Sequence, residues 1–297
     1  MSKLSERLGR RFVYTSEIAP PKGADLRGFH RELEELRRIE DKLSGVNVVD
    51  IPGSILLMSS LGGSIMVKQA GLEPVYQVAC RDRNVLALES DLLTASAYGI
   101  RNILAITGDH PRCKSSDHPG AKPVYDLDST SLLYCLGEMN QGRDLAGNKL
   151  YGGTDFYPGA ALTHTASPWE GEIHKTRKKM EVGARFFQTQ AVFDVGELKR
   201  FLDEYERHHG EDIHGKVIAG LVALYDVGII EFLESIPNVI IPFEIKNRIT
   251  NSEDSFSESI QLILEQIDEL RDEGFAGVHI MTAGNAKVLM EVFREIK

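Results

Sequence analysis

The stretch from residue 74 to residue 107, PVYQVACRDRNVLALESDLLTASAYGIRNILAIT, decides the fold class. It begins and ends with short β-rich runs, Pro74–Ala79 and Asn102–Thr107, and an amphipathic helical segment, Leu86–Tyr98, lies between them. A strand that is followed by a helix and then by another strand is typical of a right-handed unit in a parallel sheet. The same alternation extends in both directions along the chain.

Six further strands and five further helices continue this pattern. The other predicted strands are Phe12–Ser16, Val46–Asp50, Tyr157–Leu162, Arg185–Gln190, Val217–Leu221 and Gly277–Met281. The other predicted helices are Asp25–Lys42, Thr130–Gln141, Glu170–Val182, Val195–His208 and Ser257–Gly274. Eight parallel strands close a barrel whose active site lies on the loops that follow the strands. We therefore predict an α/β fold, a (β/α)8 TIM barrel, with residues 1–297 as a single domain.

One further segment complicates the strand count. Residues Asn238–Ile245 also read as a strand, although Pro237 and Pro242 weaken this reading, and we interpret them as an extended loop element between the seventh and eighth strands. An open, doubly wound sheet is the alternative fold, but no G-x-G-x-x-G motif follows the first strand. The irregular stretches His110–Asp128 and Gln141–Thr154 are interpreted as a functional or mobile loop and a surface excursion.

The composition indicates a protein that acts on small molecules. The formal net charge is −10, from 44 acidic and 34 basic residues, which argues against nucleic-acid or membrane-surface binding. Residues 1–11 lack an apolar signal, and no apolar run approaches the roughly 20 residues that cross a bilayer, so we expect a cytoplasmic protein. Cys80, Cys113 and Cys135 form no CxxC pair, so we expect apolar fillers and no metal site. We also expect a homo-oligomer.

Polar side chains follow three predicted strands, at the end where barrel enzymes carry their active sites. Glu17 follows the first strand and precedes Pro20 and Pro21, so it is a candidate general acid; a salt-bridged glutamate beside a turn is the alternative. Asp109 follows the fourth strand on a Gly-Asp turn, for which an Asx-turn or a helix cap is the alternative. Gln190 ends the sixth strand and carries both a donor and an acceptor for a heterocycle.

Two other candidates have simple structural interpretations. His164 follows the fifth strand, where a lone histidine is more often structural than functional. Lys179 ends the basic run Lys175–Lys179, whose simplest interpretation is a solvated helix face.

Three motifs, in order along the chain, are similar to motifs of a known family. Ser16–Pro21 (SEIAPP) is similar to F-E-F-F-P-P, Thr107–Asp109 (TGD) to R-G-D, and Thr189–Asp194 (TQAVFD) to T-Q-F-F-F-D. This ordered set resembles the methylenetetrahydrofolate reductase family, and the resemblance covers about residues 12–285. Cys80–Asn84 (CRDRN) is similar to the versions found in bacterial enzymes that are fused to a homocysteine methyltransferase domain.

The resemblance implies a flavin-dependent oxidoreductase of one-carbon metabolism and methionine biosynthesis. Such an enzyme reduces 5,10-methylenetetrahydrofolate to 5-methyltetrahydrofolate by hydride transfer from N5 of reduced flavin, which is usually FAD. By motif, Glu17 is the general acid and binds substrate, Asp109 lies near flavin and pterin, and Gln190 hydrogen-bonds the pterin. By gap-free counting back from Gln190, Glu172 and Lys179 fall where the family has flavin-binding Asp and Lys.

The chain departs from the family pattern at several cofactor positions. Gln77 stands where the family has a flavin-contacting His, and Thr107 stands where it has Arg. His164 lies in a segment, LTHT, that replaces a Tyr-Pro-Glu and His motif, and Thr282 keeps the Thr of the family's terminal Tyr-Thr-Leu-Asn-Arg. We carry Gln77 and His164 as cofactor-binding candidates and Thr282 as a substrate-binding candidate. FAD or FMN, and NADH, NADPH or another electron donor, stay open.

Two alternatives to a self-sufficient reductase follow. In the first, the chain is the flavin and folate subunit of an electron-transfer assembly, in which an iron–sulfur or zinc partner supplies the electrons. In the second, it is a pterin-binding barrel that transfers methyl groups without redox chemistry.

Overall fold

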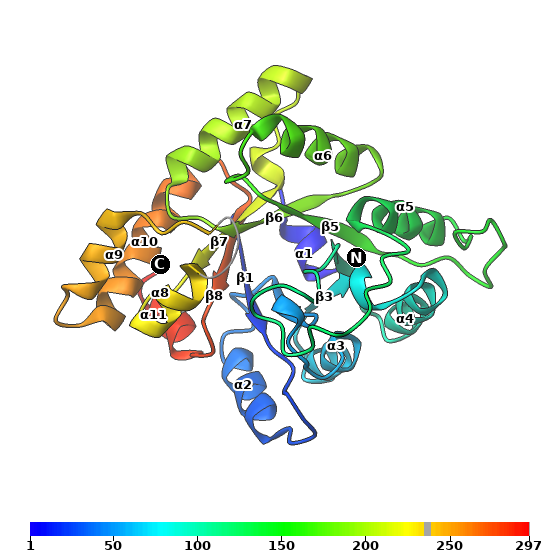
Figure 1. Cartoon of the computed structure of the whole chain (residues 1–297), viewed down its shortest axis with the longest axis horizontal. Helices are drawn as coiled ribbons and strands as arrows, with labels where there is room; N and C mark the ends of the chain where they lie inside the picture. Colours follow the sequence, from blue (N-terminus) through cyan, green and yellow to red (C-terminus); the bar gives the residue numbers. More distant parts are fainter. Residues whose placement is uncertain (235–238, 297) are drawn as a thin grey trace.

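Eight parallel strands close into a barrel in chain order (Figure 1). The computed structural model describes residues 1–234 and 239–296, apart from the side chain of residue 232. The strands are β1 (Val13–Ile18), β2 (Gly45–Val48), β3 (Pro74–Ala79), β4 (Asn102–Ile106), β5 (Tyr157–Leu162), β6 (Phe186–Ala191), β7 (Val217–Val222) and β8 (Gly277–Met281). Each predicted strand is present with ends shifted by at most two residues. The (β/α)8 barrel is confirmed, and the open-sheet alternative is wrong.

Helices surround the barrel in the order that the strand–helix alternation predicts. They are α2 (Arg27–Arg37), α3 (Ser60–Gln69), α4 (Val85–Ala97), α5 (Ser129–Asn140), α6 (Trp169–Glu181), α7 (Val195–His209), α10 (Ser255–Asp272) and α11 (Lys287–Glu295). Side-chain caps fix several starts: Asn84 accepts from the amide of Ala87, and Asp194 accepts from the amide of Glu197. Helices α3 and α11 were not among the predicted segments; α3 contains a Gly-Gly pair and has little charge to mark an amphipathic face.

The connection from β7 to α10 carries two short helices, α8 (Val227–Glu234) and α9 (Phe243–Thr250). Within the predicted extended element Asn238–Ile245, Asn238 lies outside the described residues, and residues 239–242 form no strand. Residues 243–245 are helical, because Pro242 precedes the first turn of α9, a position that suits proline. The described part of this segment thus contains no ninth strand.

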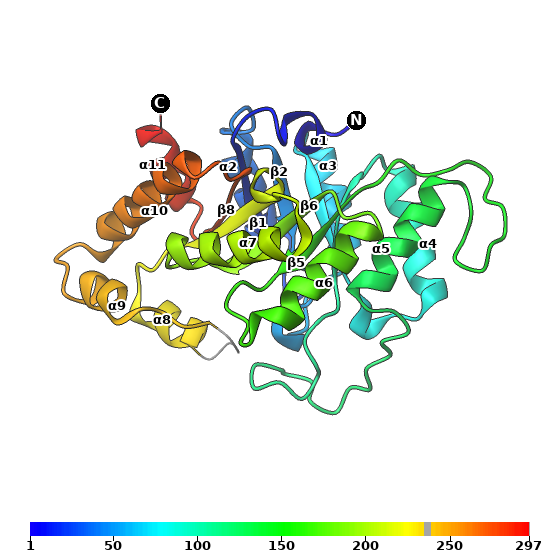
Figure 2. The same ribbon diagram turned by 90° about the horizontal axis from the view of Figure 1, so that it is seen from above.

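An apolar plug fills the amino-terminal half of the barrel. Leu4, on the short helix α1 (Lys3–Arg7), packs with inward side chains of the strands, which include Val13, Val75 and Phe186. The ring of Phe186 occupies the space beside Gly159, where a Cβ atom would lie 2.2 Å from the ring. In Figure 2, α1 lies at the upper edge, and the loop after β4 lies at the opposite, carboxyl-terminal edge.

The cysteines follow the prediction in two of three cases. Cys80 and Cys135 are buried, whereas Cys113 is partly exposed on the loop after β4. Throughout the described residues, no helix combines the length and apolar character that a membrane span requires.

Candidate active site

The carboxyl-terminal half of the barrel interior is polar. Stagger between strands places inward side chains of alternate strands at the same level. The strand registers put four residues of the even-numbered strands at one level: Asn47, Leu104, Gln188 and His279. The next level toward the mouth comes from the odd-numbered strands: Glu17, Gln77, Ala161 and Gly220. We call the level of Asn47, Leu104, Gln188 and His279 the floor. Glu17 therefore lies one layer above the floor, toward the mouth.

Glu17 is linked to a buried histidine and a buried hydroxyl. Nε2 of His279 lies 3.5 Å from Oε2 of Glu17, and Nδ1 of His279 lies 3.0 Å from Oγ1 of Thr15. The Thr15 hydroxyl donates to the carbonyl of Val278, at 3.4 Å, so its oxygen is free to accept from Nδ1–H. In the tautomer that carries the Nδ1 proton, Nε2 faces Glu17 as an acceptor. The group can hold a proton between the carboxyl and the imidazole.

Two side-chain amides meet across the barrel axis beneath Glu17. Nδ2 of Asn47 donates to Oε1 of Gln188 at 2.8 Å, and Asn47 is only 1% exposed. Among the described residues, Oδ1 of Asn47 has no hydrogen-bond partner. Buried polar atoms are normally paired, so this oxygen is an acceptor available to a donor from a ligand or water.

Sequence reasoning missed His279, Asn47 and Gln188, although a signal was present. Asn47 and His279 each lie in a strand between outward-facing apolar residues, as His279 does between Val278 and Ile280, and Gln188 follows the buried Phe187. Period-two alternation places such residues inside a barrel.

A bulge in β6 separates Gln188 from Gln190. The register with β7 shifts between Gln188 and Ala191, and the amide of Gly220 donates to the Thr189 hydroxyl at 2.9 Å. A Cβ atom at Gly220 would lie 2.9 Å from the carbonyl oxygen of Gln190. Gln188 is therefore buried, and Gln190 is exposed at the carboxyl end of β6.

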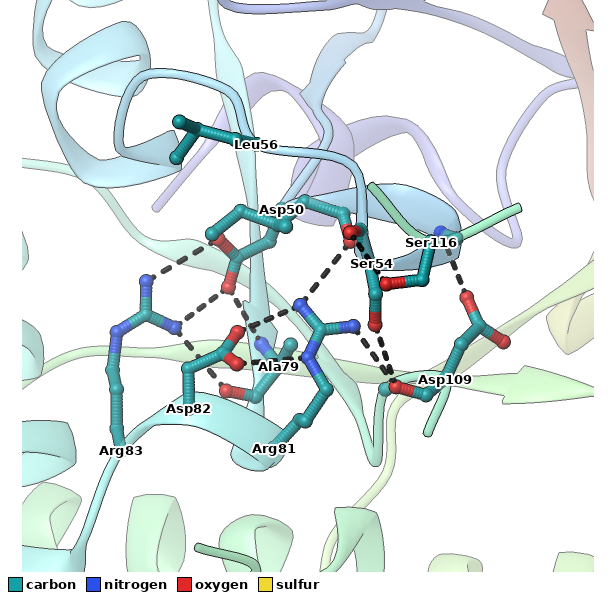
Figure 3. A network of polar contacts seen from close by, with 12 residues as sticks. Asp50, Ser54, Leu56, Ala79, Arg81, Asp82, Arg83, Asp109 and Ser116 are labelled. Carbon is teal, nitrogen blue, oxygen red and sulfur yellow. Dashed lines mark hydrogen bonds and ion pairs between the residues drawn. The ribbon is translucent and has the colours of Figure 1, made fainter. Parts of the chain in front are cut away.

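Asp109 is exposed at the mouth and ties two loops together (Figure 3). Its Oδ2 accepts from the amide of Gly53 at 2.9 Å, and its carbonyl accepts from the Ser54 hydroxyl at 3.1 Å. Gly108 precedes it with φ +90°, and a Cβ atom there would lie 3.0 Å from Cβ of Arg81. The helix-cap alternative is wrong for Asp109, because Asp128 caps α5. No hydrogen bond or ion pair joins Glu17, Asp109 and Gln190, all three of which are described.

The CRDRN segment braces the loops around the mouth (Figure 3). Arg81 is buried and donates to the carbonyls of Asp109 and Ile51, while Arg83 pairs with the fully buried carboxylate of Asp50 at 2.7 Å. Asp50 also accepts from the amide of Ala79 at 2.8 Å. The loops that follow β2, β3 and β4 are thereby held in one polar network.

Glu172 and Lys179 lie between α6 and the end of β5. Nζ of Lys179 donates to the carbonyl of Ala161 at 2.7 Å and lies 3.9 Å from Oε1 of Glu172. That oxygen accepts from the amide of Thr163 at 3.1 Å. Both side chains are buried, and burial lowers the pKa of Lys179. The solvated-face interpretation of Lys179 is wrong, and its flavin contact stays a prediction.

The remaining candidates differ in their access to the mouth. Gln77 is half-buried in the same inward layer as Glu17, and Thr282 is buried after β8. His164 is 1% exposed, and its Nδ1 has no partner among the described residues. Burial lowers the pKa of His164 to about 4, so the ring is neutral near pH 7.

Protonation of His164 is expected to make the fold sensitive to acid. The pKa is about 4 in the folded chain and 6.5 in the unfolded chain, so the unfolded chain binds more protons between these values. Stability is then complete above pH 6.5 and is lost progressively as the pH falls toward 4, by about 2 kcal/mol at pH 5. Urea unfolding of the wild type and of His164→Gln at pH 7.5 and pH 5 measures this term. An equal loss of stability in both chains would assign the pH dependence to other groups.

The comparison with known families decides the relationship. The sequence pattern of the family named Methylenetetrahydrofolate reductase matches residues 3–297. The chain belongs to the methylenetetrahydrofolate reductase family. A Caenorhabditis elegans relative, "Probable methylenetetrahydrofolate reductase (NADPH)", is 23% identical over 95% of the chain, and the match spans 42% of that protein. A Buchnera aphidicola relative, "5,10-methylenetetrahydrofolate reductase", is 25% identical over 76% of the chain and 71% of its own length.

Solved structures share the fold of this family member at low identity. An uncharacterized Clostridium thermocellum protein that binds two copies of 5-methyl-5,6,7,8-tetrahydrofolic acid has a TM-score of 0.67 at 16% identity, covering 99% of this chain and 98% of that one. The coenzyme F420 dependent tetrahydromethanopterin reductase of Methanopyrus kandleri has a TM-score of 0.61 at 11% identity, covering 96% and 98%.

Proposed function

We propose that the chain reduces 5,10-methylenetetrahydrofolate to 5-methyltetrahydrofolate, with a flavin bound at the barrel mouth. The observation that carries the proposal is the linked set of Glu17, His279 and Thr15 in the polar half of the barrel. Family membership and the folate bound by the Clostridium thermocellum protein support the choice of substrate. The named relatives support the choice of reaction.

The residues at the mouth fit the polar edges of a flavin and a pterin. Gln77 and Gln190 offer amide donors and acceptors, and the floor supplies the unpaired Oδ1 of Asn47. Ala161 and Gly220 contribute minimal side chains to the same layer as Glu17. When bound, the flavin, FAD or alternatively FMN, supplies a hydride to the one-carbon unit of the folate. NADH or NADPH is the proposed reductant.

The chain's own residues manage the proton and the charge. Opening the imidazolidine ring of the substrate requires a proton on the folate amine that leaves the one-carbon unit, and Glu17 donates it. His279 orients the Glu17 carboxyl through Nε2 and is itself oriented by Thr15. The exposed carboxylate of Asp109 stabilises the cation that ring opening creates.

The proposal is tested with the purified full chain. We expect a flavin spectrum in visible light, release of the flavin on denaturation, and folate-dependent oxidation of the reduced protein. A colourless chain that binds folate would contradict the flavin step and favour the methyl-transfer alternative.

An electron-transfer subunit is the second candidate. Gln77 replaces a cofactor-contacting His, His164 is neutral near pH 7, and Lys179 is already engaged with Ala161. Fewer cations are thus available for the phosphates of a dinucleotide. Turnover with an artificial donor but not with NADH or NADPH would favour this candidate.

Changing His279 is expected to weaken proton delivery rather than binding. His279→Gln keeps a hydrogen-bonding side chain in the barrel but cannot exchange a proton with Glu17, so kcat should fall roughly 10-fold or more. The pH at which the activity is half-maximal should shift as well, whereas the KM for folate should change little. A raised KM with an unchanged kcat would mean that His279 only shapes the pocket.

Removing the charge of Lys179 tests its predicted flavin contact. Lys179→Gln keeps a donor for the carbonyl of Ala161, and Lys178→Gln, at an exposed neighbouring position, is the matched control. We expect the flavin content after dialysis to fall at least 10-fold in the first variant and not in the second, since one phosphate ion pair is commonly worth about 1.5–3 kcal/mol. Equal flavin content in both would remove Lys179 from the cofactor site.

A further inference from the structure

The outer helices of the barrel differ sharply in charge. Seven of the 13 residues of α6 and seven of the 15 residues of α7 are charged. The 13 residues of α4, VLALESDLLTASA, include only Glu89 and Asp91. Helices α3 and α5, which precede and follow α4, are similarly poor in charge, with only Lys68 and Glu138, so these three consecutive helices depart from the polar, charged faces that outer helices of a monomeric barrel normally present to water.

The outward face of α4 is apolar or small along its whole length. Leu86 is 73% exposed and Leu93 is 41% exposed, and these leucines lie two turns apart on one face. Ser90 and Ala97 complete the same stripe, and both are exposed. We call these four residues the α4 stripe. The adjoining Tyr98, at the carboxyl end of α4, is 52% exposed.

Both charges of α4 are turned away from the stripe. Oδ2 of Asp91 pairs with Nε of Arg83 at 3.1 Å, on the side that faces the β3 loop. Oε1 of Glu89 accepts from the amide of Leu145 at 2.6 Å. Glu89 thereby holds the beginning of the 141–154 excursion against α4. The stripe is left without a charge of its own.

We propose that the α4 stripe is the contact surface of a homodimer of this chain. In a twofold dimer each patch meets its own copy, so a patch that carried only acidic residues would place carboxylates against carboxylates. In a chain of net charge −10, an uncharged face allows two copies to meet without that repulsion. The stripe is also self-complementary: an antiparallel second α4 can place its leucines over Ser90 and Ala97, whose small side chains permit close packing.

The available area matches a dimer of modest strength. Leu86, Leu93, Tyr98 and the half-exposed Tyr134 of the neighbouring α5 together expose on the order of 400 Å², taking about 200 Å² for a fully exposed large side chain. A standard interface buries about 800 Å² on each partner. Small residues of α4 and the fully exposed Tyr151 on the 141–154 excursion can supply the rest. In Figures 1 and 2, α4, α5 and this excursion lie on the same side of the barrel.

The test compares matched pairs of apolar-to-acid substitutions in the full chain. Leu86→Glu with Leu93→Glu adds two negative charges per copy to the stripe. Ile240→Glu with Phe243→Glu adds the same charge to exposed apolar residues just before and at the start of α9, a helix on the opposite side of the barrel. Sedimentation velocity over about 1–100 µM should show a wild-type dimer, a dimer for the α9 pair, and a dissociation constant raised on the order of 100-fold for the α4 pair.

A cross-link adds evidence that does not depend on disrupting the surface. Ser90→Cys, with a short bifunctional thiol reagent, should yield a covalent dimer; the wild type, whose Cys113 is partly exposed, gives the background. A wild-type chain that stays monomeric, or that associates only when another protein is added, would overturn the proposal. So would an α4 pair that dimerises as the wild type does.

Discussion

Glu17→Gln is expected to lower kcat for the reduction of methylenetetrahydrofolate by roughly 10²–10⁴-fold, the usual contribution of a general acid. The amide has the size of the carboxyl group but no acidic proton for the folate amine. It can still donate a hydrogen bond to Nε2 of His279, which the carboxyl group meets at 3.5 Å in the wild type. The fold and the contents of the barrel should therefore be retained.

The measurement separates proton delivery from the other steps. Flavin content and flavin reduction by dithionite should match the wild type, and the loss should appear only when folate is the oxidant. Glu32→Gln is the matched control. Glu32 lies on α2, and burial raises its pKa to about 7, with a contribution from the nearby negative charge of Glu17. Normal folate turnover in Glu17→Gln would remove Glu17 from the acid role. A similar loss in Glu32→Gln would mean that the local charge matters rather than the proton donor.

The fold was predictable because its signal is local. Each strand is a short apolar run, and four of the eight outer helices begin at a side-chain cap such as Asn84 or Asp194. Helix α3 escaped because a Gly-Gly pair and few charges blur its periodicity. The short helix α9 escaped because Pro242 reads as a break in a strand, although it suits the start of a helix.

The site was predictable only in part, because its geometry depends on the stagger of a closed sheet. Glu17 could be located from the end of its strand, but its connection to His279 joins the first strand to the last. The pairing of Asn47 with Gln188 likewise spans the barrel. A bulge decides that Gln188 is buried while Gln190 is exposed, and no local pattern in the sequence marks that bulge.

Asp50→Ala is expected to cost about 3–5 kcal/mol of unfolding free energy, the usual cost of removing one partner of a buried ion pair. The Asp50 carboxylate is fully buried and accepts from both terminal nitrogens of Arg83, at 2.7 Å and 3.2 Å. Its removal leaves Arg83 with Asp91 as its remaining acidic partner and leaves the amide of Ala79 without an acceptor. Urea unfolding followed by circular dichroism measures the change.

Two matched variants show whether the cost comes from burial of the charge. Asp50→Asn keeps an acceptor for Ala79 but not the charge, so its loss of stability should lie between those of the wild type and Asp50→Ala. Asp25→Ala removes an exposed partner of Arg27 and should leave the urea midpoint unchanged. Arg83 also donates to the carbonyl of Ala79, and Arg81 of the same segment donates to the carbonyl of Asp109. Asp50→Ala should therefore increase the mobility of the loops at the barrel mouth as well as lower the stability of the fold. If its urea midpoint stayed at the wild-type value, the CRDRN network could not be what holds the loops after β2, β3 and β4 in register.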